Sequence, residues 1–100
     1  MKINTKVLNN IVHLTLEGKM YVQESIIVRE EVLSQFEKGY KDFYFNMKDL
    51  EYIDSSGLGV LVGLHKKAIE QNGKVSIENL QGPVKELFEL TRLNLVFDIR

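Results

Sequence analysis

Strand-like and helix-like patterns alternate along this chain, and the connections between them are short. Four segments read as strands, because apolar residues alternate with polar ones or form a short aromatic run: residues 3–8, 11–17, 43–45 and 74–78. Three segments carry apolar residues at steps of three and four, which predicts amphipathic helices: residues 22–35, 57–72 and 84–91. Strands that alternate with helices over short connections form parallel pairs joined by right-handed crossovers. We therefore expect an α/β domain with a mixed, mostly parallel sheet of about four to five strands.

Asparagine and glycine mark several ends of these elements. Asn9 and Asn10 separate the first two strands, and paired asparagines tolerate the positive φ of a two-residue hairpin. Gly18 is expected to end the second strand, and Asn72-Gly73 to stop the second helix in a left-handed turn. The first strand thus adds an antiparallel edge to the sheet.

Three segments allow more specific predictions about burial, helix contacts and secondary structure. The aromatic run at 43–45 is typical of a strand that is buried on both faces. Gly59 and Gly63 lie inside a predicted helix, where glycine costs about 1 kcal/mol, so the pair indicates close approach to another backbone. The final apolar segment, residues 93–99, fits either a helix or a strand.

Length and charge narrow the classes of function. The 100 residues hold 13 Lys and Arg against 14 Asp and Glu, with no Cys. A chain of this length builds one core, so we expect a single domain over residues 1–100. Without cysteine there is no disulfide framework, thiol catalysis or thiolate metal site. A net charge of -1 and only nine aromatic residues argue against a nucleic acid partner.

The apolar segments also bear on cellular location. Residues 1–6 lack the long apolar core of a signal peptide. The longest apolar run, Leu58–Leu64, falls far short of the roughly 18 to 20 residues that cross a bilayer. We therefore expect a cytoplasmic protein with no direct membrane insertion.

The segment Asp54-Ser55-Ser56-Gly57-Leu58 joins a strand region to the start of an apolar helix. Asp54 or Ser55 fits the N-cap position, where a side-chain oxygen accepts from a free first-turn amide. The N-cap role explains only one of the three polar residues Asp54, Ser55 and Ser56. Two hydroxyls remain at a helix start, where the helix dipole favours negative charge, so a phosphate on Ser56 is a second interpretation. Gly57 is expected to leave that hydroxyl unshielded.

This motif and its context resemble the anti-sigma factor antagonists and, more widely, the STAS domains. The resemblance covers essentially the whole chain and is strongest in four segments: residues 43–47, 52–61, 72–74 and 84–91. It implies a STAS fold and a regulator without catalytic residues. In the bacterial partner-switching systems of this family, such a domain binds an anti-sigma factor that is also a serine kinase. The kinase then phosphorylates the second serine of the motif, which matches Ser56, and a metal-dependent serine phosphatase reverses the mark.

The resemblance also implies a partner surface. Its candidate residues are Tyr21, Asp54, Ser55, Ser56, Gly57 and Leu58. Two positions depart from the family pattern. Tyr21 stands where many members carry an Asp near the kinase-binding surface, and Arg92 replaces a turn-forming Gly in Thr91-Arg92-Leu93. Both departures bear on the identity of the partner more than on the fold.

Other site chemistry finds little support in the sequence. A serine hydrolase needs a base beside Ser56, and His65 lies nine residues further along the same helix, or about 13 Å. His13 lies on a predicted strand and could approach Ser56 only in principle. Two isolated histidines without cysteine form no metal-ligand set, and Asp49, Glu51 and Asp54 fit solvated loop acids. No phosphate-binding or dinucleotide fingerprint is present, so we expect no cofactor, no metal and no enzyme activity.

Three hypotheses of function remain open at this point. The first is an antagonist of an anti-sigma kinase, switched off by phosphorylation of Ser56. The second is a STAS interaction module without phosphorylation, serving a transporter or a signalling assembly. The third is a small enzyme that uses Asp54 or Ser56.

Overall fold

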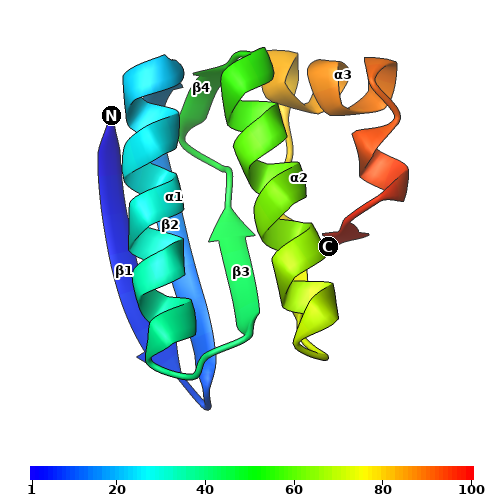
Figure 1. Cartoon of the computed structure of the whole chain (residues 1–100). Coiled ribbons are helices and arrows are strands. Elements are labelled where there is room, and N and C mark those ends of the chain that lie inside the picture. The colour runs from blue at the N-terminus through cyan, green and yellow to red at the C-terminus, as the bar shows by residue number, and fades with distance from the viewer.

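The computed structural model describes all residues from 1 to 100 (Figure 1). Its strands and helices, in chain order, are β1 (Lys2–Leu8), β2 (Ile11–Met20), α1 (Val22–Glu37), β3 (Asp42–Asn46), β4 (Leu50–Ile53), α2 (Ser55–Glu70), β5 (Lys74–Glu78), α3 (Gly82–Leu90) and β6 (Asp98–Ile99). A short 3-10 helix, Leu93–Leu95, precedes β6.

The strands form one mixed sheet in the order β1-β2-β3-β5-β6, with β4 paired to the far end of β2. Only β1 and β2 are antiparallel, and every other pair is parallel. The hairpin between them has Asn9 at φ 53° and Asn10 at φ 64°, as expected for paired asparagines. The predicted mixed, mostly parallel sheet is confirmed. It has six strands rather than about four to five, because the short strands β4 and β6 also pair.

Strand β2 does not end at Gly18, as the sequence suggested, but continues to Met20. Gly18 has φ 98°, and the register between β2 and β4 shifts between Gly18 and Lys19. A glycine at positive φ suits a bulge, which turns a strand without ending it. The bulge directs the last residues of β2 away from β3 and toward β4, so β2 carries the chain to the start of α1.

Helices α1 and α2 lie side by side over one face of the sheet, and α3 lies next to β4 (Figure 1). The core lies between this face and the helices. Its largest fully buried residues include Leu14, Leu16, Phe43, Phe45, Met47, Leu61, Ile77 and Phe88. The expectation that the 43–45 strand is buried on both faces was wrong. Phe43 and Phe45 are fully buried, but Tyr44 is only half-buried and packs edge-on against His13 on the face away from the helices.

The expected backbone contact at Gly59 and Gly63 is also absent. Both glycines are exposed, and a Cβ built on either would meet nothing within 4 Å. The close backbone approach occurs instead at Gly73, where a Cβ would collide with the Lys41 backbone. Asn72 takes the left-handed conformation that stops the helix, with φ 64°. The two helix glycines therefore leave open space rather than make a contact.

The final segment, 93–99, contains both kinds of structure that its sequence allowed. It forms the 3-10 helix Leu93–Leu95 and then the two-residue strand β6, which pairs with β5. Phe97 lies between them and is buried against Phe88. None of the helices has the length and apolar character needed to cross a bilayer.

Candidate functional site

Asp54 determines where α2 begins. Its backbone is extended, with φ -101° and ψ -177°, and its Oδ1 accepts a hydrogen bond from the Gly57 backbone N–H at 3.1 Å. Asp54 is thus the N-cap that the sequence allowed. The helix starts at Ser55, two residues before the predicted start at Gly57. Both serines therefore belong to the first turn of α2.

Ser55 and Ser56 present hydroxyl groups at this helix start. Ser55 is exposed and Ser56 is half-buried. Neither hydroxyl is hydrogen-bonded to another group of the chain. The free amides of a first helical turn and the helix dipole favour negative charge at this place. An anionic group carried by Ser56 would therefore lie at the positive end of α2.

Gly57 and Leu58 lie beneath the two serines rather than on the surface. A Cβ on Gly57 would come within 2.6 Å of the Ile53 Cγ1 atom and 3.3 Å of the Met20 Sδ atom. Leu58 is only 7% exposed and belongs to the core. Gly57 lets α2 pack closely on β4, and Leu58 anchors its first turn. We therefore expect these two residues to hold the serines in place, with any partner contact made by their neighbours.

Tyr21 is brought to the same end of the molecule as Asp54. The last residue of β2, Met20, pairs with Ile53 of β4, and the Asp54 backbone N–H donates to the Met20 carbonyl at 3.3 Å. Tyr21 occupies the N-cap position of α1 and is 48% exposed. Its ring lies 5.2 Å from the ring of Tyr52, which is 42% exposed. The two helix starts and this aromatic pair form one continuous surface.

The first turn of α2 lies between two hollows. On one side, Tyr52, Asp54 and Ser55 line a hollow of about 410 Å³ whose other wall is α3, including Pro83 and Leu87.

On the other side, Ser56 lines a hollow of about 470 Å³ between α2 and α1, together with Arg29 and Leu33 of α1. A partner that contacts the two serines can therefore insert side chains on either side of them.

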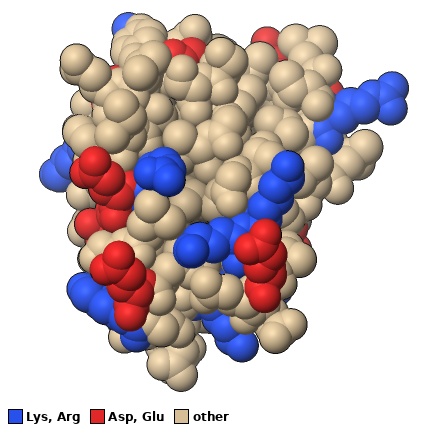
Figure 2. Space-filling model, in the orientation of Figure 1, with Lys and Arg blue, Asp and Glu red and all other residues tan.

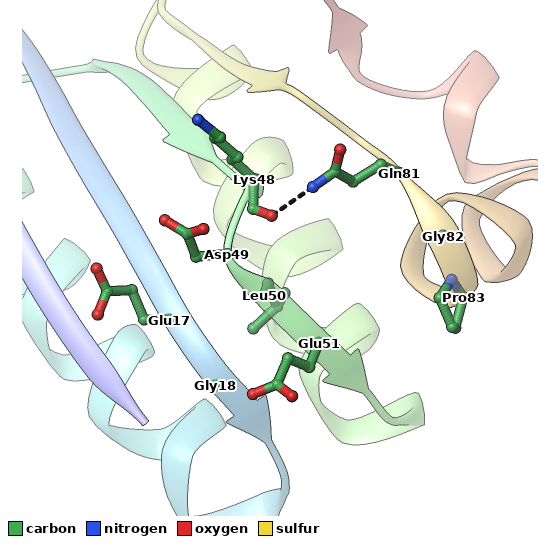
Figure 3. Close-up of a pocket in the computed structure, with 9 residues that line it drawn as sticks. All are labelled: Glu17, Gly18, Lys48, Asp49, Leu50, Glu51, Gln81, Gly82 and Pro83. Carbon is green, nitrogen blue, oxygen red and sulfur yellow. Dashed lines mark hydrogen bonds between the residues drawn. The ribbon is translucent and has the colours of Figure 1, made fainter.

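A larger, open hollow of about 890 Å³ lies elsewhere on the protein (Figure 3). It is lined by Glu17, Asp49, Glu51 and Lys48, and the Gln81 side-chain amide closes one wall by donating to the Lys48 carbonyl at 2.6 Å. In Figure 3 the carboxylate of Glu51 points away from that of Asp49. Asp49 and Glu51, which the sequence assigned to a solvated loop, line this hollow, although Glu51 belongs to strand β4. No predicted partner-contact residue lines it.

Neither histidine is placed to act as a base for Ser56. His65 packs against Phe97 with ring centroids 5.1 Å apart, and its burial lowers the pKa of the imidazole. His13 pairs with Tyr44 across β2 and β3. It lies seven residues from Met20, about 23 Å along β2. The geometry does not support the hydrolase hypothesis.

Two residues of this surface were not singled out from the sequence. Tyr52 lay in a segment too short and too irregular for its outward direction to be predicted. Arg29 is the only basic residue within segment 22–35, and this isolation was the available signal. Its closeness to Ser56 depends on how α1 packs on α2, which no local pattern reveals.

Comparison with known proteins agrees with this architecture. The STAS domain family profile matches residues 2–100. The chain is 32% identical over 99 residues to the anti-sigma-B factor antagonist of Bacillus subtilis strain 168, and the match covers 99% of this chain and 90% of that protein.

Solved structures share the fold at lower sequence identity. A Thermotoga maritima protein, provisionally assigned as an anti-sigma factor antagonist, superposes with a TM-score of 0.91 at 23% identity, covering 97% of this chain and 84% of the other. The Bacillus cell fate determinant SpoIIAA in its phosphorylated form gives a TM-score of 0.80 at 18% identity, covering 99% and 91% of the two chains. The profile match and the Bacillus subtilis relative together show that this chain belongs to the STAS domain family of anti-sigma factor antagonists.

Proposed function

We propose that this chain binds an anti-sigma factor with serine kinase activity, and that phosphorylation of Ser56 ends the binding. The observation that carries the proposal is the start of α2, where Asp54 caps the helix and Ser56 keeps a free hydroxyl at the edge of a hollow. The domain then acts as a regulator that is bound, modified and released, and not as a catalyst.

The chemistry of the proposed switch needs nothing from this chain except the hydroxyl. Ser56 Oγ attacks the γ-phosphorus of ATP, its proton passes to a base of the kinase, and ADP leaves. A serine phosphatase restores the hydroxyl by hydrolysis and releases inorganic phosphate. The half-buried Ser56 is accessible from the hollow beside it.

The phosphate would change the partner surface strongly without unfolding the domain. It brings a charge of about -1.5 to -2 at neutral pH to a chain whose net charge is -1. The positive end of α2 stabilises this charge, and the nearby Asp54 carboxylate opposes it. A partner surface that fits the uncharged hydroxyl must then desolvate a phosphate, which weakens the complex.

The remainder of the proposed contact surface is aromatic. Tyr21 and Tyr52 form an exposed pair beside Asp54 and Ser55. Exposed aromatic side chains bury large areas on binding and are enriched at the energetic centres of interfaces. We therefore assign direct partner contacts to Tyr21, Asp54, Ser55 and Ser56.

The proposal is tested by incubating the protein with ATP and an anti-sigma factor kinase from the same genome. We expect the intact mass to rise by one phosphate, and the phosphate to map to Ser56. Ser56→Ala should abolish the modification, whereas Ser55→Ala, which removes the adjacent hydroxyl of the same helical turn, should retain it.

The complex itself is measured by calorimetry with the unmodified and phosphorylated protein. We expect tight binding of the unmodified form and at least a tenfold weaker complex after phosphorylation, about 1.4 kcal/mol. Equal affinities of the unmodified and phosphorylated forms, or a phosphate that maps to Ser55, would contradict the proposed switch. Recovery of a transporter subunit in place of a kinase, in a pull-down with this chain, would favour the second hypothesis, an interaction module without phosphorylation.

A further inference from the structure

The hollow beside Ser56 has a basic side chain on its opposite wall. It is about 470 Å³ in volume and lies between α1 and α2, with Ser56 on one side and Arg29 on the other. Leu33 and Val60 supply apolar surface between them. An anionic group on Ser56 would therefore enter a space that already contains a guanidinium group.

The two exposed glycines of α2 keep this space open. Gly59 and Gly63 line the hollow three and seven residues after Ser56, and a Cβ at either position would meet nothing within 4 Å. Without side chains at these two positions, neither of them narrows the hollow between Ser56 and α1. Figure 2 shows that charged side chains gather over the lower half of this face, while few lie over the first turns of the two helices.

Arg29 has no acidic partner of its own. Helical neighbours of opposite charge would lie three or four residues away, and those positions hold Ser25, Ile26, Val32 and Leu33. Both ion pairs of the structure are made by Asp98, at the other side of the protein. The exposed guanidinium of Arg29 is therefore free to bind an anion.

The two helices bring Arg29 within reach of Ser56. Both run in the same direction and begin at the same end of the molecule (Figure 1). Arg29 is seven residues into α1, about 10 Å below its start, and Ser56 is one residue into α2, about 1.5 Å below its start. The Cα–Cβ bonds of a helix tilt toward its N-terminus, which for Arg29 is the direction of Ser56. Arg29 lines the hollow that it shares with Ser56, and also a second one further along the two helices, beside Glu37 and Lys67. The hollow that both residues line is the space that the two side chains would have to cross.

We propose that Arg29 receives the phosphate on Ser56 as an intramolecular ion pair across the hollow between α1 and α2. This inference rests on the proposed function, since it concerns the phosphorylated form of Ser56. The guanidinium donates hydrogen bonds to phosphate oxygens in the paired geometry that arginine favours. The paired phosphate and guanidinium then lie across the hollow and hinder a partner side chain from entering it, in addition to changing the charge of the surface.

Lys67 is the other cation along this groove, and it is not equivalent. It lies eleven residues after Ser56, about 16 Å along the helix, and its ammonium group is held 5.4 Å from the ring centroid of Phe36. Lys67 is therefore the matched control, because it lines the same hollow but cannot reach the phosphate.

The experiment places phosphoserine at position 56 during synthesis of the full chain, so that no kinase is needed. The phosphate is then titrated by phosphorus NMR. A free phosphoserine has a second pKa of about 6, and contact with a cation lowers it. We expect the phosphate pKa in Arg29→Gln to exceed that of the parent by at least about 0.5 units, and Lys67→Gln to match the parent.

Arg29→Lys keeps the positive charge but loses the paired hydrogen bonds of the guanidinium. We expect the phosphate pKa of this variant to lie between those of the parent and Arg29→Gln. Equal phosphate pKa values in the parent and Arg29→Gln would overturn the ion pair, as would an equal shift in Lys67→Gln. Circular dichroism of each variant shows that the fold is intact. Because the phosphoserine is built in, this result is independent of whether a kinase modifies Ser56, and the two proposals can fail separately.

Discussion

Arg92 adopts a backbone conformation that side chains normally avoid. Its φ of 59° and ψ of 19° lie in the left-handed region, between the end of α3 and the 3-10 helix. Glycine adopts this conformation readily, whereas another residue pays about 1 kcal/mol or more. Arg92 therefore adopts a left-handed turn at the position where the family resemblance implied a glycine.

We expect Arg92→Gly to raise the free energy of unfolding by about 1 kcal/mol, since the strain is relieved and the exposed side chain makes no hydrogen bond in the structure. Urea denaturation measures the change. Arg92→Ala keeps the Cβ and its strain, so it should leave stability within about 0.5 kcal/mol of the parent. A gain of equal size in the alanine variant would show that the arginine side chain, and not the backbone, is the source of the cost.

Single residues also show where sequence reasoning succeeds and where it fails. The caps and turns at Asp54, Asn9 and Asn72 could be predicted, because their signals lie within a few residues of one another. The pair Gly59 and Gly63 was misread, since local sequence does not say whether a helix face meets a neighbour or open space. The closeness of Tyr21 to Tyr52 likewise arises from the pairing of β2 with β4.

At the scale of elements, one carboxylate reinforces the pairing of the short strand β6 with β5. Asp98 Oδ2 accepts a hydrogen bond from the fully buried Ser76 hydroxyl at 2.7 Å and pairs with Arg100 at 3.2 Å and Lys74 at 3.4 Å. The Ser76 hydrogen bond is the main reason that the pKa of Asp98 lies below its ordinary value, with Arg100 and Lys74 contributing further. Arg100 also covers the ring of Tyr44, 4.7 Å from its centroid. Two residues are too few for a periodic pattern, so the sequence left open whether residues 93–99 form a helix or a strand.

The direction of the pKa shift sets how this element responds to pH. Because the folded-state pKa of Asp98 is lowered, its carboxylate stabilises the fold at any pH above the ordinary aspartate value near 3.8, and this contribution is lost as pH falls through the folded-state pKa. Asp98 is 40% exposed, so screening by solvent keeps the effect modest. Asp98→Asn should lower the melting temperature near pH 7, and the difference from the parent should shrink as pH falls well below 3.8.

Thermal melts of both proteins across this pH range measure the effect. Asp49→Asn, a change at an exposed carboxylate outside the cluster, should track the parent at every pH. A constant difference between Asp98→Asn and the parent down to the lowest pH would mean that the Asp98 charge does not hold β6.

The whole molecule explains why residues far apart in sequence form one surface. Each helix follows a strand that ends at the same edge of the sheet, so α1 and α2 begin side by side (Figure 1). The side-by-side start of α1 and α2 follows from the alternation of strands and helices, which the sequence shows. The aromatic character of the surface does not, because the contact between Tyr21 and Tyr52 depends on the pairing of β2 with β4.

We expect Tyr21→Asp to weaken binding to the anti-sigma partner at least tenfold, because it removes the ring that packs on Tyr52 and places a charge within an aromatic contact surface. Its stability should stay within about 1 kcal/mol of the parent. The lost aromatic pair costs about 0.5 to 1.5 kcal/mol at most, and aspartate at the N-cap of α1 offsets part of this loss by accepting from first-turn amides.

Calorimetry with the partner and urea denaturation of the free domain give the two readouts. Ile69→Asp is the matched control, since it introduces the same charge at a 55% exposed apolar position in the far half of α2. Both variants carry the same net charge, so a difference in affinity between them reports position and not overall charge. If Tyr21→Asp and Ile69→Asp bind the partner equally, the aromatic pair lies outside the interface, and contact is confined to the first turn of α2.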